Sequence, residues 1–136
     1  HIRDMHFMLQ KEVVERMAAE PGGRDFGRLT VMLGCALQVV KLFDVPPEAF
    51  RPPPKVVSAV VRLAPHPANT FSIDDHGALS AIVAQAFSQR RKTIRNALRH
   101  KANDAELLAA GIDPAMRPEQ VPVAEWVRLA NLIGKA

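Results

Sequence analysis

The sequence is poor in sulfur and in aromatic rings, with one cysteine (Cys35), one tryptophan, six phenylalanines and no tyrosine among 136 residues. A single cysteine cannot form an internal disulfide bond, and it cannot supply a cysteine-rich zinc site. Chains without disulfide bonds are typical of reducing compartments. We therefore expect an intracellular protein, located in the cytoplasm.

The sequence also lacks a long hydrophobic run. Its longest apolar stretch, at residues 31–40, is interrupted by Gly34 and Gln38, whereas a membrane span needs about 20 apolar residues. The first four residues are followed by no apolar segment of the kind that a signal peptide carries. Because His1 stands where an initiator methionine would be, we expect the chain to begin inside a longer protein.

Patterns that bind cofactor phosphates or metal ions are missing as well. The seven glycines form neither a G-x-G-x-x-G fingerprint nor a P-loop, so no cradle for a cofactor phosphate is predicted. The five histidines have none of the spacings of a metal site, and none is predicted. Glu12 and Glu15 lie three residues apart on a predicted helix, which is more typical of a surface than of a catalytic pair.

What the sequence does contain is enough apolar surface for a core. With 48% hydrophobic residues, the chain suits one ordinary domain, or a small domain plus part of another. Two prolines and an asparagine break regular structure soon after residue 64, and the pattern that follows is helical. We therefore predict an α/β part at residues 1–64, a linker at 65–70 and an all-helical part at 71–136.

In the α/β part, hydrophobic periodicity predicts two strands and two helices. The expected order is a short buried strand at 5–9, a helix at 10–19, a helix at 27–36 and a strand at 37–43. The valine-rich run at 56–63 predicts a closing strand. We expect the last two strands to pair antiparallel through a long connection, at one edge of an α/β sheet.

The helical part opens with Ser72-Ile73-Asp74-Asp75, which resembles a capping box with Ser72 as the N-cap residue. Apolar residues at helical spacing predict a first helix that reaches Phe87. Three further helices are predicted at residues 89–101, from Asn103 or Asp104 to Gly111, and at 123–133.

The connection between the last two strands contains three consecutive prolines directly after Phe50 and Arg51. Proline has no backbone N–H and fixes φ at about −65°, so Phe50 lies at the end of a stiff segment whose ordering costs little entropy. An aromatic side chain held in this way suits a wall against which a nucleic-acid base stacks. The simpler interpretation is a proline-rich turn that joins two strands.

Between Asp75 and Asp104 the sequence has no acidic residue, but it has a dense basic segment. Its members are Arg90, Arg91, Lys92, Arg95, Arg99 and Lys101, with His100 beside them. Such a segment repels itself unless an anion lies across it, and each neutralised phosphate releases counterions. On one helix Arg91, Arg95 and Arg99 would share a face, and the planar guanidinium suits phosphate. We therefore predict a nucleic-acid partner.

Other interpretations of the basic segment remain open. It could be the solvated face of an ordinary helix, although such a face usually mixes both signs of charge. It could lie on a membrane surface, although its apolar side lacks the Trp and Phe that such helices carry. It could belong to a helix-turn-helix DNA binder, although only Gln89 and Asn96 are obvious readers of bases.

Five segments of the chain, taken in order, resemble the KsgA-type ribosomal RNA adenine dimethyltransferases. They lie at residues 4–13, 27–32, 50–63, 86–96 and 111–117. The proline segment and the run Gln-Arg-Arg-Lys-Thr-Ile-Arg-Asn are the most specific of them. The resemblance implies an enzyme that uses S-adenosylmethionine to dimethylate the exocyclic amines of two adjacent adenosines near the end of small-subunit ribosomal RNA.

The resemblance also implies a fold and a set of site residues. The chain would hold the C-terminal part of a Rossmann-like methyltransferase sheet, followed by the small all-helical domain of the family. Phe50, with Pro53 and Lys55, would line the pocket for the flipped-out target base. Contacts to ribosomal RNA in the small ribosomal subunit would come from Lys11, Arg90, Arg91, Lys92, Arg95 and Arg99.

Three of the family's motifs lie upstream of the matched segments and do not occur in this chain: the glycine-rich loop for the methyl donor, the acidic residue for its ribose and the Asn-Leu-Pro-Tyr motif. Methyl transfer needs donor, amine and hydrogen-bond acceptors held in line. We therefore expect the isolated chain to bind no S-adenosylmethionine, to transfer no methyl groups and to self-associate through an exposed sheet edge.

A second function stays open beside part of an enzyme. The chain could be a free-standing RNA- or ribosome-binding module without chemistry.

The chain departs from the family at Gly34-Cys35-Ala36, where relatives tend to have a segment that contains an aromatic residue. Local packing around this segment is expected to differ.

Overall fold

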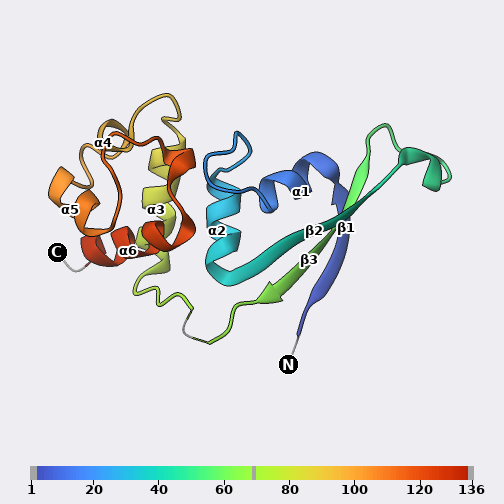
Figure 1. The fold of residues 1–136 in the computed structure, drawn as a ribbon, viewed down its shortest axis with the longest axis horizontal. Helices are drawn as coiled ribbons and strands as arrows, with labels where there is room; N and C mark the ends of the chain where they lie inside the picture. The colour runs from blue at the N-terminus through green and yellow to red at the C-terminus, as the bar shows by residue number, and fades with distance from the viewer. Residues whose placement is uncertain (1–2, 69, 135–136) are drawn as a thin grey trace.

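The computed structural model describes residues 3–68 and 70–134 as three strands, six α-helices and two short 3-10 turns. The strands are β1 (Met5–Gln10), β2 (Leu37–Val45) and β3 (Ser58–Pro65). The helices are α1 (Lys11–Met17), α2 (Arg28–Ala36), α3 (His76–Phe87), α4 (Ile94–Ala97), α5 (Asp104–Ala109) and α6 (Val123–Gly134). The turns are η1 (Pro47–Ala49) and η2 (Pro118–Gln120). Figure 1 shows the sheet with α1 at one end of the molecule and α3 to α6 at the other.

The three strands form one antiparallel sheet in the order β1-β3-β2. The predicted antiparallel pairing of the last two strands is confirmed, and it runs from Leu37 opposite Pro65 to Val45 opposite Ser58. The register shifts between Lys41 and Phe43, where β2 contains a bulge. The first strand pairs with β3 on its other side, which the sequence did not indicate.

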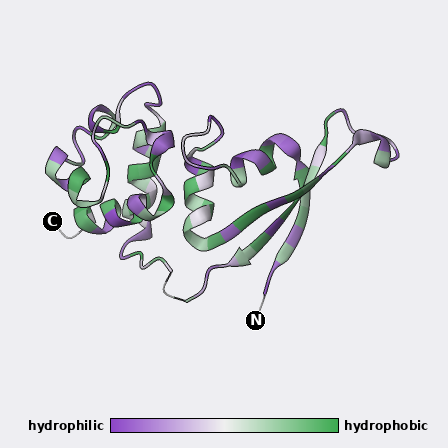
Figure 2. Ribbon diagram, in the orientation of Figure 1, coloured by the Kyte–Doolittle hydropathy of each residue, from purple (hydrophilic) through white to green (hydrophobic). Residues whose placement is uncertain are grey.

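The expectation that the first strand is buried is wrong. β1 lies at an edge of the sheet, and Phe7, Met8 and Leu9 are 45%, 51% and 37% exposed. On one face of the sheet, α1 packs on the small cluster formed by Ala59, Val61 and Leu63. Apolar side chains of the strands therefore remain on the surface. Figure 2 shows the hydropathy of the residues along these strands.

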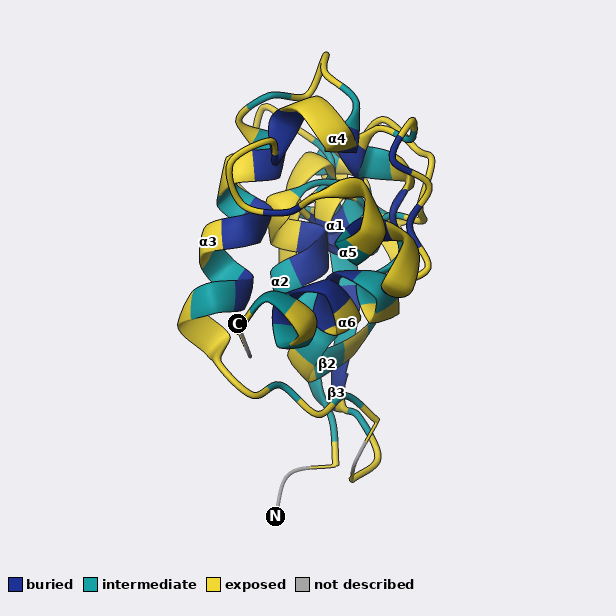
Figure 3. Ribbon diagram, turned by 90° about the vertical axis from the view of Figure 1, so that its left-hand side faces the viewer, coloured by how far each residue is buried: buried dark blue, intermediate teal, exposed yellow. Residues whose placement is uncertain are grey.

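The larger core lies among the helices and also includes α2. Phe26 and Val31, which precede the predicted linker, are buried with residues of α3, α5 and α6. Trp126 of α6 is fully buried in this core, and its indole Nε1 donates to the carbonyl oxygen of Val121 at 2.9 Å. Figure 3 views this end of the molecule and shows buried positions alternating with exposed ones along the helices.

The start of α3 differs from the prediction. Asp75, not Ser72, is the N-cap residue, and its carboxylate accepts a hydrogen bond from the backbone N–H of Ala78 at 3.1 Å. Ser72 lies outside the helix, and its carbonyl oxygen accepts from the side-chain amide of Asn131 at 2.7 Å. The sequence Ser-x-x-Asp therefore matched the capping pattern one turn too early.

The predicted helix at residues 89–101 is wrong, because only Ile94–Ala97 is helical. Residues 89–93 form turns, and the hydroxyl of Thr93 caps α4 by accepting from the N–H of Asn96. The N–H groups of Ile94 and Arg95 donate to the carbonyl oxygens of Met116 and Pro114. This loop thus fixes where the helix begins, and the basic segment is not a continuous helical face.

The remaining helices agree with the prediction. Asn103 caps α5 and forms a reciprocal capping box with Glu106. Gly111, at φ +85°, then turns the chain out of this helix, and α6 spans Val123–Gly134. No helix in the described ranges is long and apolar enough to cross a membrane.

The small residues at 34–36 have a visible role where α2 meets α6. A side-chain carbon at Gly34 would lie 3.0 Å from a methyl group of Val123, so α6 approaches α2 more closely than a larger residue allows. His66 joins this contact, with its Nε2 lying 2.6 Å from the carbonyl oxygen of Gly34. Burial raises the pKa of the neighbouring Cys35 thiol to about 11, so the thiol stays protonated at neutral pH.

Candidate nucleic-acid interface

The basic segment is arranged around two arginines that have partners within the protein. Arg90 donates from Nη2 to the carbonyl oxygen of Phe26 at 2.6 Å, and its guanidinium lies 5.6 Å from the centroid of the Phe87 ring. These contacts join the end of α3 to the loop before α2. Arg90 is therefore fixed in place by groups from both parts of the chain.

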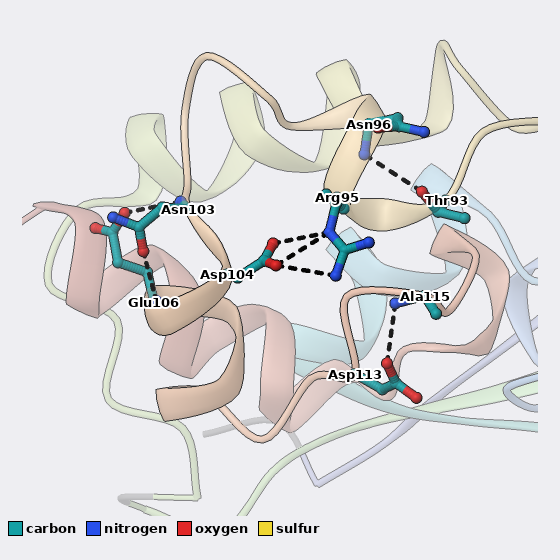
Figure 4. Close-up of polar contacts among 8 residues, drawn as sticks. All are labelled: Thr93, Arg95, Asn96, Asn103, Asp104, Glu106, Asp113 and Ala115. Carbon is teal, nitrogen blue, oxygen red and sulfur yellow. Dashed lines mark hydrogen bonds and ion pairs between the residues drawn. The ribbon is translucent and has the colours of Figure 1, made fainter.

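Arg95 is paired with an acidic residue that lies nine positions further along the chain. Its Nε donates to both carboxylate oxygens of Asp104, at 2.9 and 3.1 Å, and its Nη2 lies 2.9 Å from Oδ2 (Figure 4). This hydrogen bonding raises the pKa of Arg95. The sequence has no acidic residue at the neighbouring helical positions, and the structure supplies Arg95 with an acidic partner from farther along the chain.

The other cations of the segment are exposed. Within the described ranges, they form no ion pair and donate no side-chain hydrogen bond to the protein. They are Arg91, Lys92, Arg99 and Lys101, and His100 beside them is likewise exposed. When such a side chain binds a phosphate, no protein partner has to be displaced, so little interaction energy within the protein is lost. The structure thus divides the predicted cations into two groups. The positioned cations, such as Arg90 and Arg95, have protein partners, and the free cations have none within the described ranges.

Lys11 lies in a separate network of alternating charge. Its Nζ is 3.0 Å from Asp44 and 3.8 Å from Glu15, and Lys41 pairs with the same two carboxylates. A hydrogen bond to Asp44 raises the pKa of Lys11, and the hydrogen bonds from Lys41 and Lys11 lower the pKa of Asp44. This network ties α1 to β2.

The proline segment forms a loop that extends away from the sheet beyond β2 and β3 (Figure 1). Phe50 is half-buried just after η1, and its backbone N–H donates to the carbonyl oxygen of Pro47 at 3.1 Å. Pro53 and Lys55 are exposed. The structure therefore presents these three residues on one projecting loop, and their role at a target base stays a prediction.

A hollow of about 670 Å³ lies between α1, the start of α2 and the end of α3. It is lined by Arg16, Arg24, Arg28 and Arg90 together with three carboxylates. Sequence reasoning missed the first three arginines, because they are scattered among acidic residues and form no run. Among the described residues no cluster of metal-ligating side chains occurs either.

Comparison with known proteins connects this arrangement to a family. Residues 1–135 match the family described as ribosomal RNA adenine dimethylase. The chain belongs to the ribosomal RNA adenine dimethylase family. The resemblance noted in the sequence is thereby confirmed.

Individual relatives of this dimethylase-family chain are described as "ribosomal RNA small subunit methyltransferase A". The chain is 57% identical over 134 residues to the protein from Laribacter hongkongensis, which covers 98% of this chain and 51% of the relative. It is 57% identical over 130 residues to that of Chromobacterium violaceum, covering 96% and 50%. The chain therefore spans about half the length of the curated relatives it matches.

Solved structures show the same fold at low identity. A dimethyladenosine transferase from Plasmodium falciparum matches with a TM-score of 0.74 and 22% identity, over 94% of this chain and 56% of that one. The 23S rRNA methyltransferase ErmE matches with a TM-score of 0.67 and 24% identity, over 98% and 55%. The sheet and helices of this dimethylase-family chain thus have counterparts in the folds of RNA methyltransferases.

The methyl donor of such enzymes needs a cradle that the described residues do not supply. In α/β folds a cofactor typically lies at the carboxyl ends of parallel strands, beside a glycine-rich loop. Here all described strand pairs are antiparallel, and no glycine-rich loop follows a described strand. The described residues therefore form no cradle of this kind for S-adenosylmethionine.

Proposed function

We propose that this chain is the downstream half of an S-adenosylmethionine-dependent enzyme that dimethylates two adjacent adenosines of small-subunit ribosomal RNA. The observation that supports it is the family match over residues 1–135, together with relatives that are about twice as long. The upstream half would hold the donor and the acceptors for the target amine. The chain alone is accordingly inactive.

In this proposal the projecting loop contributes to the target-base pocket. Phe50 would stack on the extruded adenine, while Pro53 stiffens the loop and Lys55 lies beside the phosphate backbone. Stacking of a base on an aromatic side chain is worth about 1–3 kcal/mol. The half-buried position of Phe50 supports this role, because the ring is anchored while part of it stays accessible.

The ribosomal RNA would dock on the free cations of the basic segment, Arg91, Lys92 and Arg99. Arg90, Arg95 and Lys11 already have protein partners, and we propose that they chiefly hold the surface in shape. The unpaired edge of β1 would accept the upstream half, and in its absence a second copy of the chain. Self-association of the isolated chain is thus part of the proposal.

The deciding experiment measures transfer of labelled methyl groups from S-adenosylmethionine to unmethylated small ribosomal subunits. We expect none from the isolated chain and transfer from a protein in which the upstream half precedes it. In that longer protein Phe50→Leu lowers the rate about tenfold, the equivalent of about 1.4 kcal/mol, whereas Phe50→Tyr retains it because the aromatic face is kept.

The same experiment separates this proposal from a binding module without chemistry. A module binds the subunits but transfers no methyl group in either form of the protein. Binding of the isolated chain across a salt series provides the second measurement, and Arg91→Ala with Lys92→Ala is expected to reduce its salt dependence. Unchanged salt dependence would place the docking surface elsewhere.

A further inference from the structure

A second hollow, of about 320 Å³, lies between the end of α3 and the turns on either side of α4. Ala97 and Leu98, which are 3% and 0% exposed, form its floor. The cations Lys92, Arg99 and Lys101, together with His100, surround it. The hollow exists because the chain turns at residues 98–101 instead of continuing as a helix.

Its charge distinguishes this hollow from its neighbours on the described surface. No carboxylate lines it, whereas the larger hollow contains Glu12, Glu15 and Asp25. Three other hollows each include at least one glutamate. A concave site that gathers cations without any acid attracts an anion, because nothing within it neutralises the charge.

Side-chain amides also reach this hollow. Gln85 is held by its own hydrogen bond, since its Nε2 donates to the carbonyl oxygen of Ala97 at 3.4 Å. Within the described ranges, the amides of Gln89 and Asn96 have no side-chain hydrogen bond to the protein. Figure 4 shows the Asn96 amide turned away from the Arg95–Asp104 pair. An amide offers both a donor and an acceptor, as the edge of a base requires.

We propose that this hollow binds one unpaired nucleotide of the RNA, with its phosphate on Arg99 and Lys101 and its base edge on Asn96 and Gln89. The volume is near the lower limit of small-molecule sites, which suits one nucleotide and not a duplex. Proteins read unpaired RNA bases by their edges and duplex RNA by its shape. The assignment to ribosomal RNA rests on the proposed function, whereas the nucleotide site itself does not.

The first test titrates adenosine monophosphate into the chain and follows the side-chain amide signals by NMR. We expect the signals of Gln89 and Asn96 to shift together and to saturate. Asn96→Ala should weaken the binding about fivefold, because it removes a hydrogen-bonding group for the base while the exposed helix keeps its propensity. Shifts that never saturate, or that spread evenly over the surface, would overturn the site.

The second test measures how binding of a short unstructured RNA depends on salt, by fluorescence anisotropy. The double variant Arg99→Gln with Lys101→Gln should lower the logarithmic salt slope by about 0.7 for each phosphate that is no longer neutralised. The matched control, Arg24→Gln with Arg28→Gln, removes the same charge from the hollow that contains acids and should leave the slope unchanged. Equal slopes in the two double variants would contradict the proposal.

The two proposals fail in different ways. If the chain binds adenosine monophosphate in the hollow but does not bind small ribosomal subunits, the nucleotide site stands and the docking function falls. If it binds the subunits but the hollow variants behave as the control does, the docking function stands on Arg91 and Lys92 without Arg99, and the nucleotide site is overturned.

Discussion

At the scale of single residues, the arginines of the basic segment differ in whether they have a partner within the protein. All four of Arg90, Arg91, Arg95 and Arg99 are exposed. Within the described ranges Arg91 and Arg99 have no side-chain partner, whereas Arg90 and Arg95 donate hydrogen bonds to protein groups at 2.6 and 2.9 Å. Sequence spacing predicted one set of phosphate contacts, because it tests for acids only at helical neighbours. Asp104 lies nine positions from Arg95, and it is brought close by the turn between α4 and α5.

The network around Asp44 predicts a dependence of stability on pH. The pKa of Asp44 lies below its ordinary value of 3.8, because Lys41 and Lys11 donate hydrogen bonds to the carboxylate. A lowered folded-state pKa means that the stabilisation is fully present above pH 3.8 and is lost as the pH falls through the folded value. Asp44→Asn should therefore lower the free energy of unfolding at neutral pH, and less so in acid.

Urea denaturation at neutral and at acidic pH provides the measurement. Asp74→Asn is the control, because Asp74 has no ion pair in the described ranges. The difference between wild type and Asp44→Asn should shrink with acid, while Asp74→Asn follows wild type throughout. A constant difference would mean that the asparagine acts through packing and not through charge.

At the scale of elements, periodic patterns located most helices and strands but not their ends. The strand at residues 37–43 and the helix at 123–133 were predicted within two residues, because long apolar repeats define them. The helix at 89–101 was overpredicted. Its boundary depends on backbone bonds from Ile94 and Arg95 to residues 114–116, and no local pattern reveals such a distant partner.

The N-terminus of α3 offers a direct test of such a boundary. Asp75→Ala removes the carboxylate that accepts from the N–H of Ala78 and should lower the free energy of unfolding by about 1 kcal/mol. Ser72→Ala should have little effect, because Ser72 precedes the helix. Thermal or urea denaturation measures both variants. The reverse ranking would restore the capping box that the sequence suggested.

At the scale of the whole molecule, a core crosses the boundary predicted at the linker. Phe26 and Val31 are buried among the helices of the C-terminal part, although they precede the linker by more than thirty residues. The sequence could not show this, because a hydrophobic pattern indicates which face of a helix is buried but not its partner. The prolines, in contrast, did predict a stiff connection between the last two strands, whereas the free edge of β1 follows from the strand order that the structure shows.

Arg90 connects the two parts of the molecule. Substitution of Arg90 should therefore lower the free energy of unfolding more than substitution of its neighbour Arg91. Arg90→Ala removes both the hydrogen bond to Phe26 and the contact with the Phe87 ring. A hydrogen bond to a charged group contributes about 1.5–3 kcal/mol, and a cation–π contact at an exposed site about 0.5–1. Because Arg90 is exposed, we expect a loss near the lower limit, about 1–2 kcal/mol.

The control is the neighbouring substitution Arg91→Ala, which removes an exposed cation and should change the free energy of unfolding by less than about 0.5 kcal/mol. Chemical denaturation of the two variants, followed by Trp126 fluorescence, compares them directly, because Trp126 reports the core that Arg90 adjoins. If RNA contact were the only role of Arg90, both variants would be equally stable in the absence of RNA. An unstable Arg90→Ala variant would show that this arginine is needed to build the surface before RNA arrives.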